Sequence, residues 1–349
     1  MTAPLIGFYY LAMSNRKKIS ITASAALIIA IVFNLLSCSS QKTLKQVVDS
    51  VPAKNFENYD FSVDMELIDR LNASSDMVMD YLRKYDDPNG NYSLLVLEDK
   101  ERSILKEYLD LLPENYLDVF KERLLGIYVV DNFLGSGMAD YVISKEGLIY
   151  TILVLNPYLF STSLSEMLTY KENTIYKTET GDIKANIKLS GNFLGLLYIL
   201  LHEGTHILDY ALRISPYVEP GMAQFQEAKK NSSPFSEETW DDYDKPKPGF
   251  QASYQGRISF YSEDENVKVP RKEAKQVYEE LAGLPFVSVY SYSNWAEDLA
   301  EYAAFYILTQ TQGLDYSINV VENGQTMFTL RPFDNPKVRA RAANLDFLN

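Results

Sequence analysis

The stretch GNFLGLLYILLHEGTHILDYALRI, residues 191–214, determines how the rest of the sequence is interpreted. It is apolar almost all round, which predicts a buried helix. The only two histidines among the 349 residues, His202 and His206, stand four apart in this segment, with Glu203 between them. On a helix this spacing places both imidazoles on one face, where they can bind one zinc ion.

Glu203 and a third ligand complete the expected chemistry. Glu203 lies about a third of a turn from His202, so its carboxylate stands beside the metal and can act as general base for the attacking water. Catalytic zinc sites usually have three protein ligands. The chain has no third histidine, and its one cysteine, Cys38, lies in an export signal. The third ligand must therefore be an aspartate or a glutamate.

The best candidate for the third ligand lies in SNWAEDLAEYAAFYILTQ, residues 293–310, which also predicts a helix. Glu297 and Glu301 stand four apart there on a stripe that becomes apolar. Two like charges in this position would repel each other and would lose hydration on burial. A bound cation would compensate for both effects. We expect Glu297 to bind the metal, with Glu301 or Asp298 as alternatives. Glu297 could instead act only as the capping-box partner of Asn294.

Two further acids are expected to support the site without binding the metal. Histidines that bind a metal usually hydrogen-bond through their other ring nitrogen. Glu301, one turn beyond Glu297, and Asp209, about one turn beyond His206, are placed to accept such hydrogen bonds.

The pair HEGTHILDY and NWAEDLAEYAAF resembles the gluzincin family of zinc metallopeptidases, and especially the branch of the anthrax lethal factor catalytic domain. In that branch HExxH is likewise followed by a short acidic-then-tyrosine stretch, and the second helix reads ExxAE. The resemblance implies an α+β, zincin-like domain with a small mixed sheet, a buried HExxH helix and a glutamate-bearing helix. The residues that it assigns to zinc are His202, His206 and Glu297. It makes Glu203 the general base and points to Tyr290, or else Tyr292, as the partner of the developing oxyanion.

Periodicity and turn residues predict the other elements of the first half. Helical spacing covers residues 62–84 and 100–124, with a break at Pro113 in the second segment. Three segments rich in β-branched and aromatic residues are expected to form strands of one sheet, and these are 126–132, 139–145 and 147–156. We expect the last of them to form the sheet edge beside the cleft, where an extended peptide could pair.

The second half predicts fewer regular elements. Residues 214–285 are rich in proline and acidic residues, which indicates a loop-rich insertion with one helix near 271–282. Asn323-Gly324 predicts a hairpin turn, and the last residues predict a short helix. Ser190 or Asn192 could cap the buried HExxH helix.

The N-terminal sequence predicts export and lipid attachment. A basic stretch, RKK at 16–18, precedes an apolar run and LLSC at 35–38, which resembles a bacterial lipobox with Cys38 as the lipidated residue. The alternative is a plain membrane anchor helix. The position of the basic residues also favours a translation start at Met13. The expected divisions are a signal peptide 1–37, a tether 38–59 and a catalytic domain 60–349 with a helical first part 60–125.

Charge narrows the range of partners. The formal net charge of −14 repels phosphate backbones, so nucleic acid is not expected as a partner. We expect a zinc endopeptidase of a bacterial cell envelope, anchored to a membrane by the lipid on Cys38 and acting on peptides or proteins. Two alternatives remain: a catalytically inactive lipoprotein on a zincin fold, and a metal-dependent hydrolase that acts on another bond, such as one in the cell wall.

Overall fold

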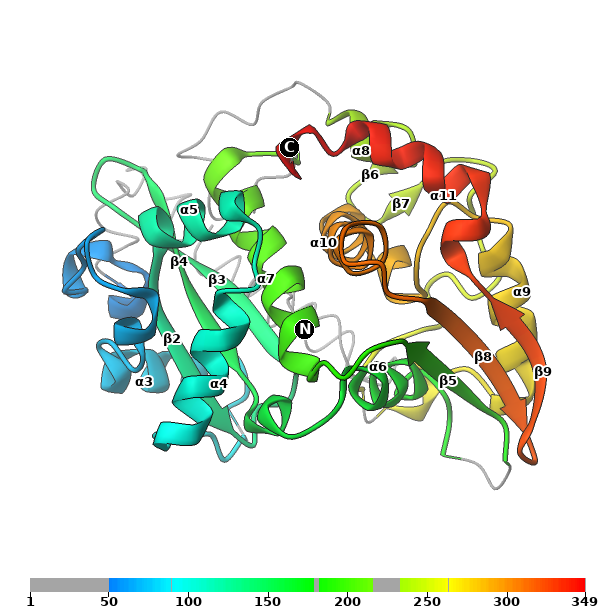
Figure 1. Ribbon diagram of the computed structural model, residues 1–349, viewed down its shortest axis with the longest axis horizontal. Coiled ribbons are helices and arrows are strands. Elements are labelled where there is room, and N and C mark those ends of the chain that lie inside the picture. The colour runs from blue at the N-terminus through cyan, green and yellow to red at the C-terminus, as the bar shows by residue number, and fades with distance from the viewer. Residues whose placement is uncertain (1–49, 89, 179–181, 216–232, 263, 349) are drawn as a thin grey trace, which may run out of the picture.

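The computed structural model describes residues 50–88, 90–178, 182–215, 233–262 and 264–348. Its fold is α+β, as expected: a four-stranded and a three-stranded β-sheet lie on opposite sides of two central helices, α7 and α10, and β6 and β7 form a third, two-stranded sheet (Figure 1). The predicted signal peptide 1–37 and Cys38 lie outside the described residues. Within the described ranges, no helix combines the length and the apolar character needed to cross a membrane.

The first sheet contains four strands in the order β1-β2-β4-β3. They are β1 (Ser93–Leu95), β2 (Leu124–Asp131), β3 (Gly137–Ile143) and β4 (Ile149–Leu155). β2 runs parallel to β4, whereas β1 and β3 are antiparallel to their neighbours. The prediction that three strands between residues 126 and 156 share one sheet is confirmed. The prediction that 147–156 forms the edge is wrong, because β4 pairs on both sides, and the strands at the two edges are β1 and β3.

Helices cover both faces of this sheet (Figure 1). On one face lie α4 (Asp99–Leu109), α5 (Glu114–Arg123) and α7 (Gly195–Leu212), and on the other lies α3 (Ser75–Tyr85). Side chains alternate along β2 because successive residues of a strand point to opposite faces. Ile127 and Val129 therefore join the core beneath α7, and Tyr128 and Val130 join the core beneath α3. The expected break at Pro113 is confirmed, since this residue precedes α5.

The second sheet has three antiparallel strands in the order β5-β8-β9. They are β5 (Lys184–Leu189), β8 (Tyr316–Glu322) and β9 (Gln325–Leu330). The predicted hairpin turn is confirmed: Asn323 and Gly324 connect β8 to β9 with φ angles of 50° and 79°. Helix α6 (Leu164–Asn173) packs on β5, and α9 (Ala274–Ala282) packs on β8 and β9. Neither β5 nor α6 was expected from the sequence.

Helices α7 and α10 (Trp295–Tyr306) pack against each other between the sheets (Figure 1). Asn294 caps α10 by accepting hydrogen bonds from two backbone amides of its first turn, and α10 continues into a π-helical turn, Ile307–Thr311. The expected side-chain cap of α7 is absent from the described structure. Leu194 occupies that position, and the Gly195 N–H donates instead to the Thr162 carbonyl. The remaining short elements are α8 (Pro234–Glu237), β6 (Trp240–Asp242), β7 (Lys245–Pro246) and α11 (Pro336–Ala340).

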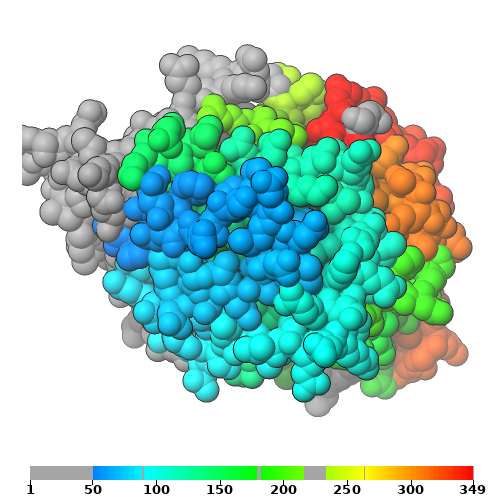
Figure 2. All heavy atoms as spheres, turned by 60° about the vertical axis from the view of Figure 1, so that its left-hand side comes forward, coloured from blue at the N-terminus to red at the C-terminus, as the bar shows by residue number. Residues whose placement is uncertain are grey.

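Residues 50–59, expected to be the last part of the tether, lie against the first sheet. They form two 3₁₀ turns, Pro52–Lys54 and Phe56–Asn58, and a third, Leu67–Arg70, follows. Ala53 and Tyr59 belong to the core beneath α3. Figure 2 shows this N-terminal part, in blue, spread over one face of the molecule beside the cyan helices. The docked domain therefore includes at least residues 50–59, which lie before the predicted boundary at residue 60.

Candidate metal centre

Helices α7 and α10 bring together the three residues that the sequence assigns to a metal. His202 and His206 project from α7 and Glu297 from α10, and one ligand atom of each lies within 4.8 Å of the other two. The Glu297 Oε2 atom is 3.2 Å from Nε2 of His202 and 3.5 Å from Nε2 of His206. Zinc bonds of about 2.0–2.1 Å in a tetrahedral arrangement would separate such atoms by about 3.3 Å. The two distances from Glu297 are therefore close to those that a bound ion would give.

The cluster is buried and electrostatically matched to a cation. The exposed fractions are 1% for His202, 7% for His206 and 3% for Glu297. Burial alone would raise the pKa of Glu297, but the charge of His206 and hydrogen bonds with both histidines lower this pKa to about 2. Glu297 is therefore a carboxylate at neutral pH, the form that binds a metal.

Glu301 holds His202 from the side opposite Glu297. Its Oε1 atom is 3.0 Å from the Nδ1 atom of His202, as expected for an acid that orients a ligating histidine. The same oxygen accepts hydrogen bonds from Lys171, at 2.7 Å, and from Tyr198, while Ser288 donates to the second oxygen. Burial would raise the pKa of Glu301, but Lys171 and His202 lower it below its ordinary value.

The protonation of His202 follows from these two acids. Burial alone would lower the pKa of His202, whereas the hydrogen bonds with Glu297 and Glu301 raise it overall. Both ring nitrogens thus face carboxylates, Nε2 toward Glu297 and Nδ1 toward Glu301. A divalent cation bound to Nε2 would replace the proton that otherwise stabilises this arrangement.

Glu203 lies between the histidines and the edge strand. Its Oε2 atom accepts a hydrogen bond of 2.8 Å from the backbone N–H of Ala139 in β3. This close approach requires Gly137, because a Cβ atom there would lie 2.6 Å from Ile199 and 3.2 Å from the Cγ of Glu203. Glu203 is therefore anchored to the sheet beside the cluster, and its carboxylate is not among the three groups that could hold the ion.

Of the two candidate tyrosines, Tyr290 reaches the cluster. Its ring centroid lies 5.9 Å from that of His202, and the Lys171 ammonium lies 4.1 Å from the Tyr290 ring centroid. Burial first, and then the charges of Glu297 and Glu203, raise the pKa of Tyr290 well above its ordinary value, so the phenol keeps its proton. Tyr292 is engaged elsewhere, because its hydroxyl accepts from the Ala252 amide.

The two remaining acids have other partners. Asp298, an alternative ligand from the sequence, forms a buried ion pair with Arg341, with a hydrogen bond from Trp240 as well. Asp209 accepts hydrogen bonds from the backbone N–H and the hydroxyl of Ser215, so it secures the chain after α7. Burial raises the pKa of Asp209, although the neighbouring charge of His206 acts in the opposite direction.

Five residues of the site were missed from the sequence: Gly137, Ala139, Lys171, Tyr198 and Ser288. Lys171 carried a weak signal, because it lies in the amphipathic stretch that forms α6, and a buried lysine requires a buried acid. Around the cluster, the side chains of Ser136, Lys171, Tyr198, Ile199, His202 and Tyr290 pack so closely that the space between them does not admit a water molecule.

Comparisons with protein families, with curated proteins and with solved structures gave no match to this chain. The interpretation of the site therefore depends on its own geometry and chemistry. His202, His206 and Glu297 form a buried cluster that could hold a metal ion.

Proposed function

We propose that the protein is a zinc-dependent peptidase with a zincin-like catalytic domain of the gluzincin type. The observation that carries the proposal is the position of Glu203. Its carboxylate adjoins two histidines that face an ionised glutamate, and it also contacts the backbone of an edge strand. Edge strands can bind extended peptides through backbone hydrogen bonds. A base between such a strand and a metal cluster is suited to peptide hydrolysis.

The donor set favours zinc over other common ions. Two imidazoles and one carboxylate are typical of catalytic zinc sites, whereas magnesium and calcium prefer oxygen ligands. When bound, zinc would polarise the scissile carbonyl and acidify the attacking water. His202, His206 and Glu297 would hold the ion, and Glu301 would keep the His202 ring in its binding orientation.

The protein's own groups would carry the proton transfers. Glu203 would take a proton from the attacking water and deliver it to the leaving amine. Tyr290, which keeps its proton, would donate a hydrogen bond to the developing negative charge on the carbonyl oxygen. In an antiparallel strand the N–H and C=O of one residue point to the same side, so the Ala139 carbonyl would be the backbone group that accepts from the substrate.

The test is the Glu203→Gln variant, which keeps the shape of the side chain but removes the base. We expect unchanged zinc content and a loss of peptidase activity of about 10³-fold or more, as for removal of a group acting at the transition state. Glu122→Gln, at an exposed position of α5, is the matched control. Equal activity of the Glu203→Gln variant and the parent would refute the proposal.

A second candidate function is a metal-binding protein without turnover. The burial of the cluster favours it, since the exposed fractions of His202, Glu203 and Glu297 are 3% or less. The same experiment separates the two candidate functions. A metal-binding protein without turnover should contain zinc in its parent form but hydrolyse no peptide. A polar edge-strand contact of Glu203 argues for the peptidase, because a structural zinc site uses four protein ligands and no base.

We also propose that the protein is exported and attached to a bacterial membrane through a lipid on Cys38. The support is the sequence LLSC at 35–38 after a basic and apolar run. Cells fed a labelled fatty acid should transfer the label to the parent and not to a Cys38→Ala variant. Equal labelling of both proteins would contradict the proposal.

A further inference from the structure

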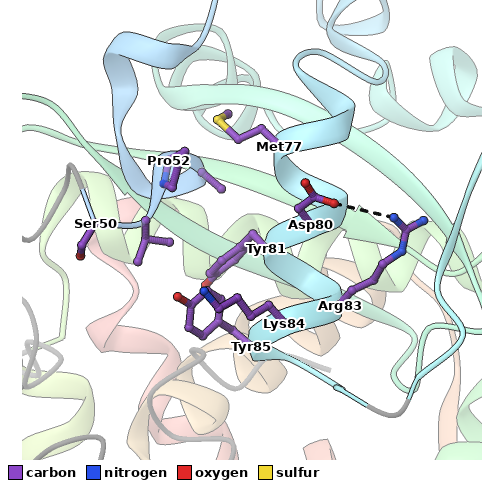
Figure 3. A pocket seen from close by; sticks show the side chains of 10 residues that line it. Ser50, Pro52, Met77, Asp80, Tyr81, Arg83, Lys84 and Tyr85 are labelled. Atoms are coloured by element: carbon purple, nitrogen blue, oxygen red, sulfur yellow. Dashed lines mark ion pairs between the residues drawn. The ribbon is translucent and has the colours of Figure 1, made fainter. Parts of the chain in front are cut away.

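The residues that would perform the chemistry are closed off from solvent. The exposed fractions are 0% for Glu203, 1% for His202 and 7% for Tyr290, and the side chains packed around His202 and Tyr290 leave no space that admits a water molecule. Figure 3 shows a wider cavity, of about 620 Å³, between Ser50–Ala53 and α3. It lies on the other face of the first sheet, and the residues that line it include none of the candidate site. A peptide can therefore reach the site only if part of the protein moves.

Two neighbouring aromatic residues, Phe260 and Tyr261, lie between this site and the surface. The Phe260 ring packs edge-on against Tyr290 with 4.8 Å between the ring centroids, and the Tyr290 centroid lies 5.9 Å from that of His202. The Tyr261 ring lies 5.9 Å from the ring of Tyr170, which is 60% exposed. Residues 258–262, which carry both aromatic rings, therefore cover the metal cluster. We call this segment the lid.

Two hydrogen bonds of Tyr261 connect the lid to the elements around the site. Its backbone N–H donates to the hydroxyl oxygen of Thr174 at 3.2 Å, and its own hydroxyl lies 3.1 Å from the hydroxyl oxygen of Ser136. Ser136 lines the closed space beside His202. The hydrogen bond between Tyr261 and Ser136 thus joins the lid directly to the wall of the site.

The backbone of the lid is strained at this contact. Tyr261 has a φ angle of 55°, in the left-handed region that a bulky side chain rarely adopts. Such a conformation costs free energy and persists only while the surrounding contacts hold it. When the hydrogen bond to Ser136 breaks, Tyr261 can relax to an ordinary φ angle and carry Phe260 away from Tyr290. The strain therefore favours opening once this hydrogen bond is lost.

The segment that precedes the lid is held to α9 and can stay in place when the lid moves. Ser253 donates from its backbone N–H and from its hydroxyl to the Glu280 carboxylate, at 2.8 and 2.7 Å. Arg257 pairs with Glu273 at 2.8 Å, immediately before the lid begins. Lids of enzymes commonly move in this way, with a few residues at the end of a fixed segment absorbing the change.

We propose that residues 258–262 form a lid that opens to admit the substrate peptide, with the hydrogen bond between Tyr261 and Ser136 as its latch. The inference rests on the proposed peptidase function, since a peptide bond must come within reach of Glu203 and Tyr290. A zinc ion bound to His202 lies behind the same lid. Zinc should therefore enter and leave the site chiefly while the lid is open.

The experiment measures the exchange of zinc, which requires no peptidase activity. The full chain is purified in detergent, and the rates of zinc uptake and of zinc release to a coloured chelator are measured by rapid mixing. Tyr261→Phe removes the latching hydroxyl and keeps the ring, while Ser136 retains its hydrogen bond with Tyr158. Loss of one neutral hydrogen bond shifts an equilibrium by about two- to tenfold. We expect both rates to rise by that factor and the dissociation constant of zinc to stay unchanged.

An equal rise in both rates distinguishes a lid from a residue that only supports the ligands. Loss of support would speed release and weaken binding without faster uptake, and this result would overturn the inference, as would two unchanged rates. Tyr170→Phe, which removes a hydroxyl from the exposed ring beside Tyr261, is the matched control and should exchange zinc at the parent's rates. If circular dichroism shows that Tyr261→Phe does not fold, Ser136→Ala removes the other half of the latch and decides instead.

Peptide hydrolysis separates the lid from the proposed function. In Tyr261→Phe, kcat/KM for a peptide of about ten residues should rise by the same factor as zinc exchange, because both depend on the open lid. A parent that binds zinc but hydrolyses no peptide would refute the peptidase function, and the rates of zinc exchange would still decide on the lid. A parent that hydrolyses peptides, with zinc exchange unaltered in the variant, would refute the lid alone. A parent that binds no zinc would refute both.

Discussion

Helix α10 carries buried acids on two of its faces, and their partners differ in kind. On one face, both oxygens of Asp298 bond to the Arg341 guanidinium, at 2.9 and 2.6 Å, and Trp240 adds a donor at 2.8 Å. On the other, Glu297 faces the imidazoles of His202 and His206. The first arrangement is a structural ion pair, and the second fits a metal ion.

The difference lies in the chemistry of the cation. Arginine is permanently charged and offers no acceptor, so a bidentate pair with aspartate is complete and leaves no place for an ion. Histidine can lose its proton and then bind a metal through the same nitrogen. A buried acid alone therefore does not identify a metal site. What distinguishes the two faces of α10 is that the histidines beside Glu297 can become neutral, whereas Arg341 beside Asp298 cannot.

The largest expected effect comes from breaking the structural pair. Arg341→Met leaves the buried Asp298 charge without its partner and should lower the free energy of unfolding by about 3–5 kcal/mol, measured by urea denaturation. Zinc affinity of the folded variant should stay within about threefold of the parent. Arg339→Met, at an exposed position nearby, is the control. A loss below about 1 kcal/mol would show that this face contributes little to stability.

Breaking the other face should affect binding more than folding. Glu297→Gln removes the charged ligand, so zinc affinity should fall by more than about 100-fold. Loss of a residue that only supports the ligands costs at most about that much. Zinc should raise the melting temperature of the parent but not that of the variant, because a protein that binds little zinc gains little stability from it. Without zinc, the variant should be moderately less stable than the parent at neutral pH, because the histidines that lower the pKa of Glu297 also stabilise its charge in the fold. Undiminished zinc binding would move the third ligand to another acid.

Glu301 tests whether the metal face depends on its supporting network. Glu301→Gln keeps the size of the side chain but loses the charge that faces His202, Lys171 and Ser288. Zinc affinity should fall by about 10–100-fold, measured by competition with a chelator. An unchanged affinity would mean that α7 alone orients His202. Glu166→Gln, an exposed acid on α6, serves as control.

The sequence predicted the parts of this site that depend on local pattern. His202, Glu203 and His206 share one helix, so their spacing alone places them on it. Glu297 followed from its place on a second helix near a second acid. The buried character of α7 and the strands β2, β3 and β4 was likewise readable from hydrophobic runs and turns.

Contacts between segments that are distant in the chain could not be predicted from the sequence. Lys171 meets Glu301 across 130 positions and Arg341 meets Asp298 across 43, and no periodicity encodes such pairings. The edge strand, in contrast, carried a signal that was overlooked. β4 is a continuous apolar run, typical of a central strand, whereas β3 contains the inward-pointing charge of Asp140, a common feature of edge strands.

The smallest expected effect concerns Asn294, which caps the helix that carries both acids. Asn294 caps α10 by accepting from the amides of Ala296 and Glu297, so it fixes the start of the helix that presents both acids. Asn294→Ala should cost about 1 kcal/mol of stability, and Asn294→Ser should restore most of it, because serine caps nearly as well. Zinc affinity should fall only a few-fold.

The affinity change is the informative part of that experiment. The Arg341 pair holds α10 from Asp298, the residue after Glu297, so the first turn should keep its place when the cap is lost. A large drop in zinc affinity with little loss of stability would mean that the cap, and not the ion pair, positions Glu297. A small drop would mean that the ion pair between Asp298 and Arg341 fixes the position of α10, while Glu297 on the other face binds the ion.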